Sequence, residues 1–197
     1  MAKTSVAILA KAPVPGTAKT RLIPAIGAHA AAVLQERLTA RAAATAQAAD
    51  IGPVTLWCAP DATHRSFREL GVTLRPQPEG DLGARMLAAF EDGPTLVIGA
   101  DCPALTPAHL CDAARALETH DIVLIPAEDG GYVLIGASAR HPALFEAMIW
   151  SVPTVLAETR ARIATLGLKA AELPPLWDVD TEDDLARMER VFPELTL

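Results

Sequence analysis

The sequence predicts an α/β fold of three layers, α/β/α, built on a mostly parallel sheet in one domain over residues 1–197. Short apolar segments alternate with helical patterns from the start of the chain, which is typical of a parallel sheet covered by helices. Hydrophobic residues make up 51% of the chain, which is enough for a buried core and too many for disorder. Alanine is abundant and aromatic residues are only 4%, a composition that favours helices packed closely on a sheet.

The first part of the chain is predicted to begin with a strand over 4–10 and a loop over 11–24. Three prolines and Gly16 lie in that loop, so it is not helical throughout. An alanine-rich helix over 29–49 and a strand over 54–59 follow.

The middle of the chain continues the alternation. A helix over 62–70 leads to a short strand over 72–75, a turn over 76–80, and a helix through Phe90 for which Asp81 is a suitable N-cap. The elements expected next are a strand over 95–98, a helix over 107–118 with Thr106 as its N-cap, and strands over 121–126 and 132–136. The last of these follows its predecessor so closely that it is a candidate to run antiparallel.

The final part is predicted to contain helices over 142–148 and 154–166, a strand over 169–173 and a closing helix over 183–191. Thr181 precedes that helix and Asp184 follows three residues later, as in a capping box. Capping accounts for these acids, whereas it does not account for Asp178 and Asp180.

Charge and cysteine content exclude several classes of protein. The formal net charge is −7, which argues against nonspecific binding to nucleic acid. The three cysteines fit neither a disulfide framework nor a zinc site. The apolar stretch at 5–10 is too short for a signal peptide or a membrane span. We therefore expect a soluble cytoplasmic protein with no membrane partner.

The stretch Pro94-Thr-Leu-Val-Ile-Gly-Ala-Asp-Cys-Pro is the most informative in the chain. An apolar strand stops at Asp101, which places this carboxylate at the carboxyl edge of the sheet, where open α/β sheets bind ligands. Asp178 and Asp180 form an Asp-x-Asp whose carboxylates project to one side of an extended segment. Hard oxygen ligands of this kind suit Mg²⁺ or Mn²⁺ near phosphate. A lone Asp101 would otherwise be read as the cap of a turn.

The loop after the first strand reads Lys11-Ala-Pro-Val-Pro-Gly-Thr-Ala-Lys-Thr-Arg and lies at the same edge as Asp101. Gly16, after Pro15, permits close backbone approach, and Lys19 and Arg21 offer positive charge to phosphate. The spacing is neither that of a P-loop nor that of a dinucleotide-binding fingerprint. A solvated loop of lysines and arginines is the alternative interpretation.

Two further glycine-containing segments are candidate ligand sites. Gln77-Pro-Glu-Gly-Asp-Leu-Gly-Ala-Arg places Gly80 and Gly83 at a helix start, where backbone amides can face a base, a ribose or a phosphate, with Arg85 on the first turn. A turn capped by Asp81 is the alternative. Glu128-Asp-Gly-Gly-Tyr places two acids and two glycines at the carboxyl end of the fifth strand. A hairpin turn would explain the glycines but not this location.

These motifs together resemble those of bacterial glycosyltransferase-like proteins of the GT-A type, including arsenosugar-biosynthesis glycosyltransferase-like proteins. The resemblance covers residues 6–185 and rests on long motifs in a fixed order. It extends to the phospholactate and molybdenum-cofactor guanylyltransferases. The implied fold is the Rossmann-like nucleotide-diphospho-sugar transferase fold, with the nucleotide over the amino-terminal half.

The resemblance also implies roles for individual residues. Asp101, Lys19 and Arg21 would be catalytic, and Asp101 would bind metal together with Asp178 or Asp180. The nucleotide would be bound by Lys11, Pro15, Gly16, Lys19, Arg21, Gln77, Gly80, Gly83 and Arg85. The acceptor would be bound by Glu128, Asp129, Gly130 and Gly131. One departure is that Asp101-Cys-Pro carries a single acid where many GT-A transferases have Asp-x-Asp, so a second acid is needed.

The sequence-based hypothesis is therefore a transferase that uses Mg²⁺ or Mn²⁺ and an activated nucleotide. Sugar transfer from a nucleotide sugar to a small-molecule acceptor is slightly favoured. Nucleotidyl transfer from a nucleoside triphosphate to a phosphorylated small molecule is nearly as well supported, because a Lys-x-Arg loop suits a triphosphate. A non-catalytic nucleotide-binding protein is the third possibility.

Overall fold

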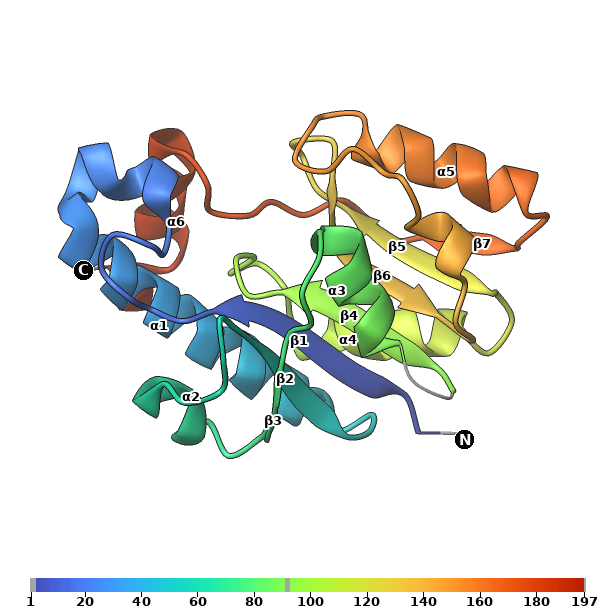
Figure 1. The fold of residues 1–197 in the computed structure, drawn as a ribbon, viewed down its shortest axis with the longest axis horizontal. Helices are drawn as coiled ribbons and strands as arrows, with labels where there is room; N and C mark the ends of the chain where they lie inside the picture. The colour runs from blue at the N-terminus through green and yellow to red at the C-terminus, as the bar shows by residue number, and fades with distance from the viewer. Residues whose placement is uncertain (1–2, 91–92, 197) are drawn as a thin grey trace.

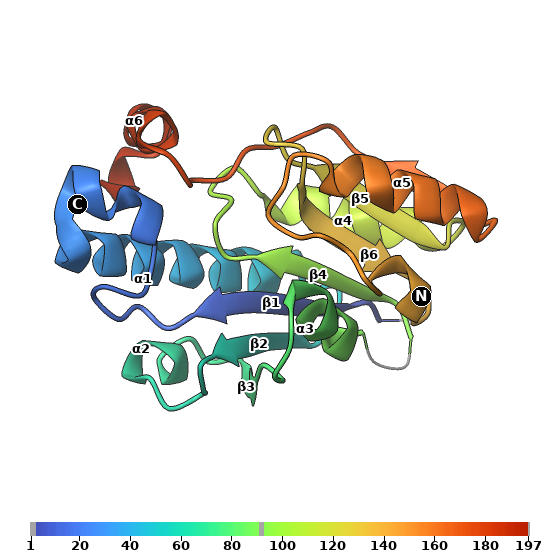
Figure 2. The same ribbon diagram turned by 45° about the horizontal axis from the view of Figure 1, so that its top comes forward.

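In the computed structural model, which describes residues 3–90 and 93–196, helices cover both faces of one twisted sheet (Figures 1 and 2). The predicted α/β/α fold with a mostly parallel sheet is confirmed. Within the described residues the sheet has seven strands in the order β3-β2-β1-β4-β6-β5-β7. The strands are β1 (Ser5–Lys11), β2 (Val54–Ala59), β3 (Thr73–Pro76), β4 (Thr95–Gly99), β5 (Ile122–Pro126), β6 (Tyr132–Ala137) and β7 (Ala170–Glu172).

Every strand pair is parallel except those that involve β6, which runs antiparallel to both β4 and β5. The expected antiparallel strand is therefore confirmed. Its position was not foreseen, because β6 lies between β4 and β5 and separates them. Since β6 begins where β5 ends, the turn over 128–131 still lies at the edge where β1 and β4 end.

The helices are α1 (Ile23–Ala49), α2 (Arg65–Arg68), α3 (Leu82–Ala89), α4 (Pro107–Ala116), α5 (Val155–Thr165) and α6 (Glu182–Val191). Short 3-10 helices are η1 (Thr20–Leu22), before α1, η2 (Pro142–Leu144), before α5, and η3 (Pro193–Leu195), after α6. Asp81, Thr106 and Thr181 cap α3, α4 and α6 with their side chains, as expected.

Three helices differ from their predicted ranges, and the one expected over 62–70 is only the four-residue α2. The helix expected over 142–148 is only the three-residue η2, because Ala147 takes a left-handed backbone conformation that a helix cannot contain. The helix expected to begin at His29 begins earlier, in the predicted loop, with Pro24 in its first turn. Gly27 interrupts it with φ +81°, so the two parts of α1 are kinked at the one residue type that adopts this conformation readily.

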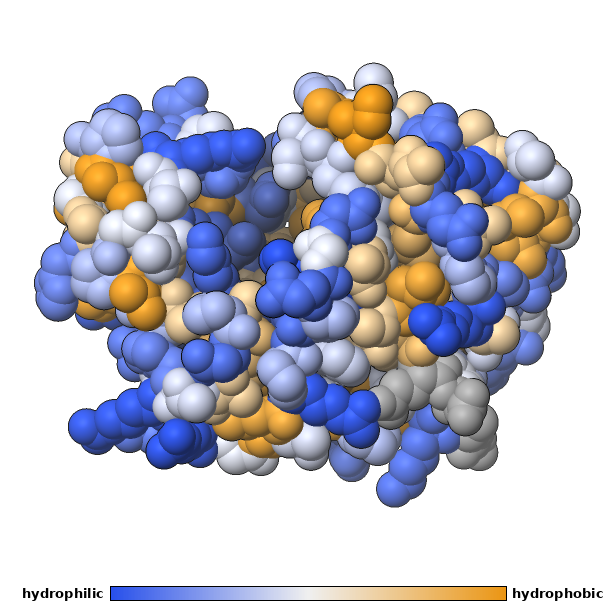
Figure 3. Space-filling view, viewed as in Figure 1, coloured by the Kyte–Doolittle hydropathy of each residue, from blue (hydrophilic) through white to orange (hydrophobic). Residues whose placement is uncertain are grey.

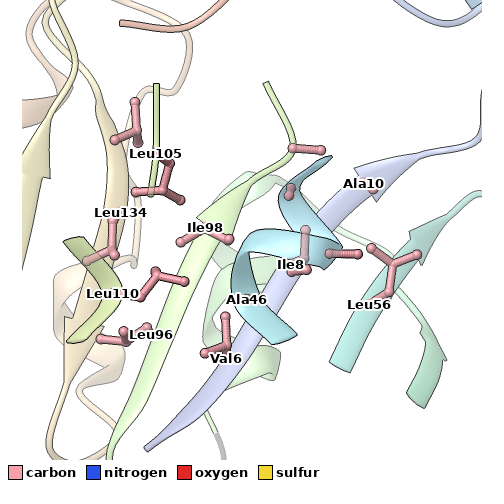
Figure 4. Close-up of a cluster of buried hydrophobic side chains, with 14 of the residues drawn as sticks. Val6, Ile8, Ala10, Ala46, Leu56, Leu96, Ile98, Leu105, Leu110 and Leu134 are labelled. Carbon is pink, nitrogen blue, oxygen red and sulfur yellow. The ribbon is translucent and has the colours of Figure 1, made fainter. Parts of the chain in front are cut away.

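The core fills both faces of the sheet. Val6, Ile8 and Ala10 of β1 lie on one face with the alanines of α1 and with α4 (Figure 4). Ala7, between them, lies on the other face with α3 and α5. This alternation is the period of two expected of a strand buried on both sides. The scarcity of aromatic residues thus agrees with the close packing of α1 on β1 and β2.

A third apolar cluster lies beyond the sheet and holds α6 against the first part of α1. Trp177 and Val179 contribute to it from the segment that crosses the carboxyl edge of the sheet. This packing fixes the extended segment 174–181 above the ends of the strands, where Figure 1 shows it as a red trace.

Candidate functional site

A cavity of about 480 Å³ opens at the carboxyl ends of β1, β2 and β3, next to Asp101 after β4. The space-filling view shows a hollow here, between the lobe formed by α6 with the start of α1 and the lobe that carries α3 (Figure 3). Its polar lining consists of Lys11, Thr17, Lys19, Thr20, Arg21, Gln35, Gln77, Arg85, Asp101, Ser151 and Asp180. Four cations and two acids therefore surround one space, as expected of a site for an anionic ligand.

Lys19 is buried and is bound to two other segments. Its ammonium lies 2.8 Å from Oδ1 of Asp101 and donates a hydrogen bond of 2.6 Å to the carbonyl of Val179. The main-chain amide of Val179 in turn donates to the carbonyl of Asp101 at 3.0 Å. The loop after β1, the end of β4 and the segment before α6 are thus joined at a single point.

Arg21 and Asp180 form an ion pair and hydrogen bond at the more exposed side of the same cavity. Both side chains are at least one-third exposed, so solvent screens this pair and it adds little to stability. The pair matters for the site because Asp180 already has an arginine partner, whereas Asp178 forms no such pair with Arg21. The two acids of the Asp-x-Asp motif therefore have different environments.

Asp178 is the acid with the most unfavourable surroundings. Burial, together with the nearby carboxylates of Asp129 and Asp101, raises its pKa to about 6, and Lys19 offsets this only in part. The structure thus gathers three acids that the sequence places 28 and 49 residues apart. Asp178 itself is not among the residues that line the cavity.

No group of three or more histidine, cysteine, aspartate or glutamate side chains in the described residues is arranged to hold a metal ion by itself. A metal at this edge would therefore need oxygen ligands from the bound substrate as well. Mg²⁺ commonly binds in this way, through one or two carboxylates plus phosphate oxygens.

Lys11 and Arg85 are the two cations of the cavity that form no ion pair with any residue the structure describes. The Nε atom of Arg85 is buried and has no hydrogen-bond partner among the residues that the structure describes. A buried donor without an acceptor is uncommon. These two side chains are therefore available to an anionic ligand.

Gln77 lies at the end of β3 and faces the cavity with a fixed amide orientation. Its Nε2 atom donates to the carbonyls of Trp57 and Ala10, at 2.8 Å and 3.3 Å. Because both partners are carbonyl oxygens, the NH₂ group of the amide faces them. The carboxamide oxygen of Gln77 is left as an acceptor for a donor on the ligand.

Gly83 and Gly130 allow another segment of the chain to approach their backbone closely. A Cβ on Gly83 would lie 2.8 Å from the ring of Trp150, and one on Gly130 would lie 2.1 Å from the carbonyl oxygen of Pro153. Both contacts come from the segment 148–153, which we call the bridging segment and which also places Ser151 in the cavity. The close approach of this segment therefore requires glycine at both positions.

The remaining predicted residues are exposed or already paired. Glu128 binds Arg187 of α6 through both carboxylate oxygens, and Asp129 accepts a hydrogen bond from the amide of Gly131. Pro15, Gly16 and Gly80 are exposed and lie outside the lining of the cavity. The turn over 128–131 is also outside the lining of the cavity, although the charge of Asp129 helps to raise the pKa of Asp178.

The sequence analysis missed Gln35 and Ser151, which both line the cavity. Gln35 lies inside the alanine-rich helix α1, and its only sequence signal is a polar residue on a buried face. Burial raises the pKa of the thiol of Cys102, next to Asp101, to about 12, which disfavours the reactive thiolate. The site chemistry thus depends on carboxylates, cations and hydroxyl or amide groups.

A family model described as "Uncharacterized protein conserved in bacteria (DUF2064)" matches residues 39–152, more than half of the chain. The chain belongs to this family. The match includes Gln77, Arg85 and Asp101. Lys19 and Asp178, which approach Asp101 from either side, lie outside the matched range.

Solved structures support the same fold over nearly the whole chain. A protein from Desulfovibrio desulfuricans, provisionally named a nucleotide-diphospho-sugar transferase, has 25% identity and a TM-score of 0.86, covering 98% of this chain and 90% of its own. A nucleotidyl transferase from Methanothermobacter thermautotroptrophicus has 14% identity and a TM-score of 0.63, covering 97% and 98%.

A third similar structure is CMP:2-keto-3-deoxy-manno-octonic acid synthetase complexed with CTP. It has 10% identity and a TM-score of 0.62, and the match covers 98% of this chain and 99% of that one. No curated protein matches the sequence. All three structures share the fold that the sequence predicts.

Proposed function

We propose that the protein is a transferase that uses an activated nucleotide and a divalent metal ion, and that it moves a sugar from a nucleotide sugar to a small-molecule acceptor. The observation that carries this proposal is the cavity at the carboxyl edge of the sheet, where unpaired cations and the carboxylate of Asp101 face one space. Anionic phosphates and the metal that accompanies them need this combination.

The donor set fits Mg²⁺ or Mn²⁺. Asp101 and Asp178 supply hard oxygen ligands, and Asp101 lies close enough to raise the pKa of Asp178. Asp180 is paired with Arg21 and is the weaker candidate. When bound, the metal would neutralise charge on the phosphates and on the leaving group.

The residues of the chain would divide the substrate between them. Lys11, Arg21 and Arg85 would bind the phosphates, with Pro15 and Gly16 shaping the loop that carries Arg21. The oxygen of Gln77 would accept from the base, next to the start of α3 at Gly80 and Gly83. In sugar transfer an acceptor oxygen attacks the anomeric carbon, the bond to the nucleoside diphosphate breaks, and these cations stabilise the departing charge.

The acceptor side of the proposal is the turn over 128–131. Asp129 is exposed there and close to Asp178, so an acceptor held by Asp129 would lie beside the proposed metal. Glu128, Gly130 and Gly131 would shape this turn, since Glu128 is bound to Arg187 and Gly130 packs on Pro153.

Nucleotidyl transfer is the second candidate, favoured by a specific observation. The nucleotidyl transferase and the CTP-bound synthetase share the fold over nearly their full length, and the cations Lys11 and Arg85 would equally suit a triphosphate. In that reaction a phosphorylated acceptor attacks the α-phosphate and pyrophosphate leaves. The motifs that resemble arsenosugar-biosynthesis glycosyltransferase-like proteins favour the sugar donor.

Thermal unfolding with a panel of nucleotide sugars and nucleoside triphosphates, each with Mg²⁺, with Mn²⁺ and with EDTA, tests the proposal. A ligand that binds only the folded protein raises the melting temperature by mass action. We expect a metal-dependent increase with a nucleotide sugar. An increase with triphosphates alone would favour nucleotidyl transfer, and no increase with any ligand would contradict both.

The Asp101→Ala and Asp178→Ala variants separate a catalyst from a protein that only binds nucleotide. We expect both variants to lose donor consumption and the metal-dependent part of binding. If nucleotide binding survives in both variants and the wild type consumes no donor, the non-catalytic alternative would replace the proposed transferase.

A further inference from the structure

The side chain of Lys19 is only 5% exposed, in a cavity where it was expected to meet phosphate. A buried ammonium is stable only when its hydrogen bonds are made within the protein. Two of its three donors are used, by Asp101 and by the carbonyl of Val179. Its backbone is left-handed, with φ +46°, a conformation that a residue with a side chain adopts only when its surroundings require it.

Asp101 is held from two directions, by Lys19 and by Val179, which Lys19 also binds. The ammonium holds the carboxylate, and the amide of Val179 holds the main-chain carbonyl of the same residue at 3.0 Å. Because Asp178 directly precedes Val179, the same contacts keep Asp178 beside Asp101. Without Lys19, these two acids would repel each other with no cation buried between their segments.

Lys11 and Arg85 differ from Lys19 in their ion pairing. They line the same cavity and form no ion pair with a described residue. A phosphate group would therefore bind them without breaking an existing ion pair. Binding to Lys19 would require competition with Asp101 for a side chain that is hardly accessible.

We propose that Lys19 is a positioning residue rather than a phosphate ligand: it holds the carboxylate of Asp101, and with it Asp178, in the arrangement that binds the metal. This inference rests on the proposed function for the identity of the ligand. It changes the role of Lys19, which acts through Asp101, and it leaves direct phosphate contact to Lys11, Arg21 and Arg85.

The first experiment compares Lys19→Met with Arg85→Met by calorimetric titration of the nucleotide that binds the wild type best. Each protein is titrated in Mg²⁺ and in EDTA. We expect Lys19→Met to weaken binding about tenfold or more in Mg²⁺, the usual effect of removing a side chain that orients a metal ligand, and to leave binding in EDTA unchanged. Arg85→Met should weaken binding in both conditions.

A loss of affinity in EDTA for Lys19→Met, as large as its loss in Mg²⁺, would overturn the proposal and make Lys19 a phosphate ligand. Repeating the nucleotide titrations over a series of Mg²⁺ concentrations gives a second reading, the Mg²⁺ concentration at half-saturation. It should rise for Lys19→Met and stay at the wild-type value for Arg85→Met. An unchanged value for Lys19→Met would also contradict a positioning role.

A second experiment needs no ligand and separates this inference from the proposed function. The melting temperatures of Lys19→Met, Asp101→Asn and the double variant form a thermodynamic cycle. We expect the double variant to lose clearly less than the two single variants together, because each single change leaves one charge unpaired. Additive losses would show that Lys19 does not hold Asp101, whatever the protein binds. If Lys19→Met does not fold, Lys19→Gln takes its place in both experiments.

Discussion

Asp178 is a carboxylate held among other carboxylates, and this gives the site a measurable pH dependence. Burial comes first among the causes of its raised pKa of about 6, followed by Asp129 and Asp101. A group that takes up a proton more readily in the folded state than in the unfolded state destabilises the fold once it ionises. Its cost is absent below about pH 4 and complete above the folded-state pKa.

The Asp178→Asn variant should therefore be more stable than the wild type at pH 8, by about 1–3 kcal/mol, when measured in EDTA. The gain should shrink as the pH falls through 6 and vanish near pH 4, where both proteins are neutral at this position. Urea unfolding at several pH values measures it. Asp183→Asn, an exposed acid in the first turn of α6, is the matched control and should show no comparable change between pH 5 and 8.

If Asp178→Asn is no more stable than the wild type at pH 8, burial and the neighbouring carboxylates do not raise the pKa of Asp178. A gain that persists unchanged to pH 4 would point to better packing by asparagine instead of the removal of charge. Added Mg²⁺ should reverse the order of stability when nucleotide is present, because only the wild type keeps both proposed metal ligands.

At the residue scale, the sequence predicted which charged residues meet but not how they pair. Asp101 and Asp178 come together because a strand end and an extended segment share one edge of the sheet, which pattern alone can indicate. The pairing of Lys19 with Asp101 depends on side-chain burial across 82 residues of sequence, which no local pattern encodes. Gln35 and Ser151 were missed because neither belongs to a recognisable motif.

At the scale of elements, the bridging segment 148–153 explains two glycines that the sequence analysis assigned to ligands. Trp150 packs over Gly83 at the start of α3, and Pro153 packs on Gly130 in the turn before β6. The amide of Leu156 also donates to the carbonyl of Gly130 at 2.9 Å. The segment therefore connects the proposed donor side of the site with the proposed acceptor side.

The Gly130→Ala variant should lose about 2–4 kcal/mol of stability, because the added methyl group meets the carbonyl of Pro153 and the backbone is left-handed at φ +92°. Thermal or urea unfolding measures this loss. Gly131→Ala is a close control, since the atoms nearest to its added Cβ belong to the exposed side chain of Asp129, at 3.2 Å or more, and not to backbone. Equal losses in the two variants would mean that the contact with Pro153 does not hold the segment.

Most elements were predictable because their patterns are local. Apolar runs gave the strands, and Asp81, Thr106 and Thr181 gave the starts of three helices through caps that the structure contains. The prediction of a helix over 142–148 failed because contacts with distant residues decide the structure of this segment. Its apolar residues pack against α3 and α5 as an irregular segment, with Phe145 beside Phe90, so tertiary contacts overrode the local pattern.

At the scale of the whole molecule, the sheet order was the part that the sequence did not determine. Parallel, helix-covered strands followed from the alternation of patterns, whereas the placement of β6 between β4 and β5 depends on long-range pairing. Within the described residues no helix has the length and apolar character needed to cross a membrane. Local patterns thus predict the three-layer arrangement, whereas the order of the strands depends on contacts between distant residues.

Hydrogen exchange should divide the molecule by its position in this sheet. Amides of β1, β4 and β6, which pair on both sides, should exchange only through global unfolding, whereas those of the edge strands β3 and β7 should exchange faster through local opening. Exchange followed by mass spectrometry of peptides measures the difference. Protection of β3 equal to that of β4 would contradict this picture and indicate that a further element covers the edge.

The contacts among Lys19, Asp101 and Val179 join segments that the ribosome makes at very different times. Strands β1 to β6 precede residue 138, so the central strands are complete once the chain has emerged from the ribosome to that point. Asp101 then lacks the hydrogen bond from Val179, and Lys19 lacks the carbonyl that it binds. Pairing of strands β1 to β6 therefore needs no residue beyond 137, whereas the site also needs residues 178–180 to have left the ribosome.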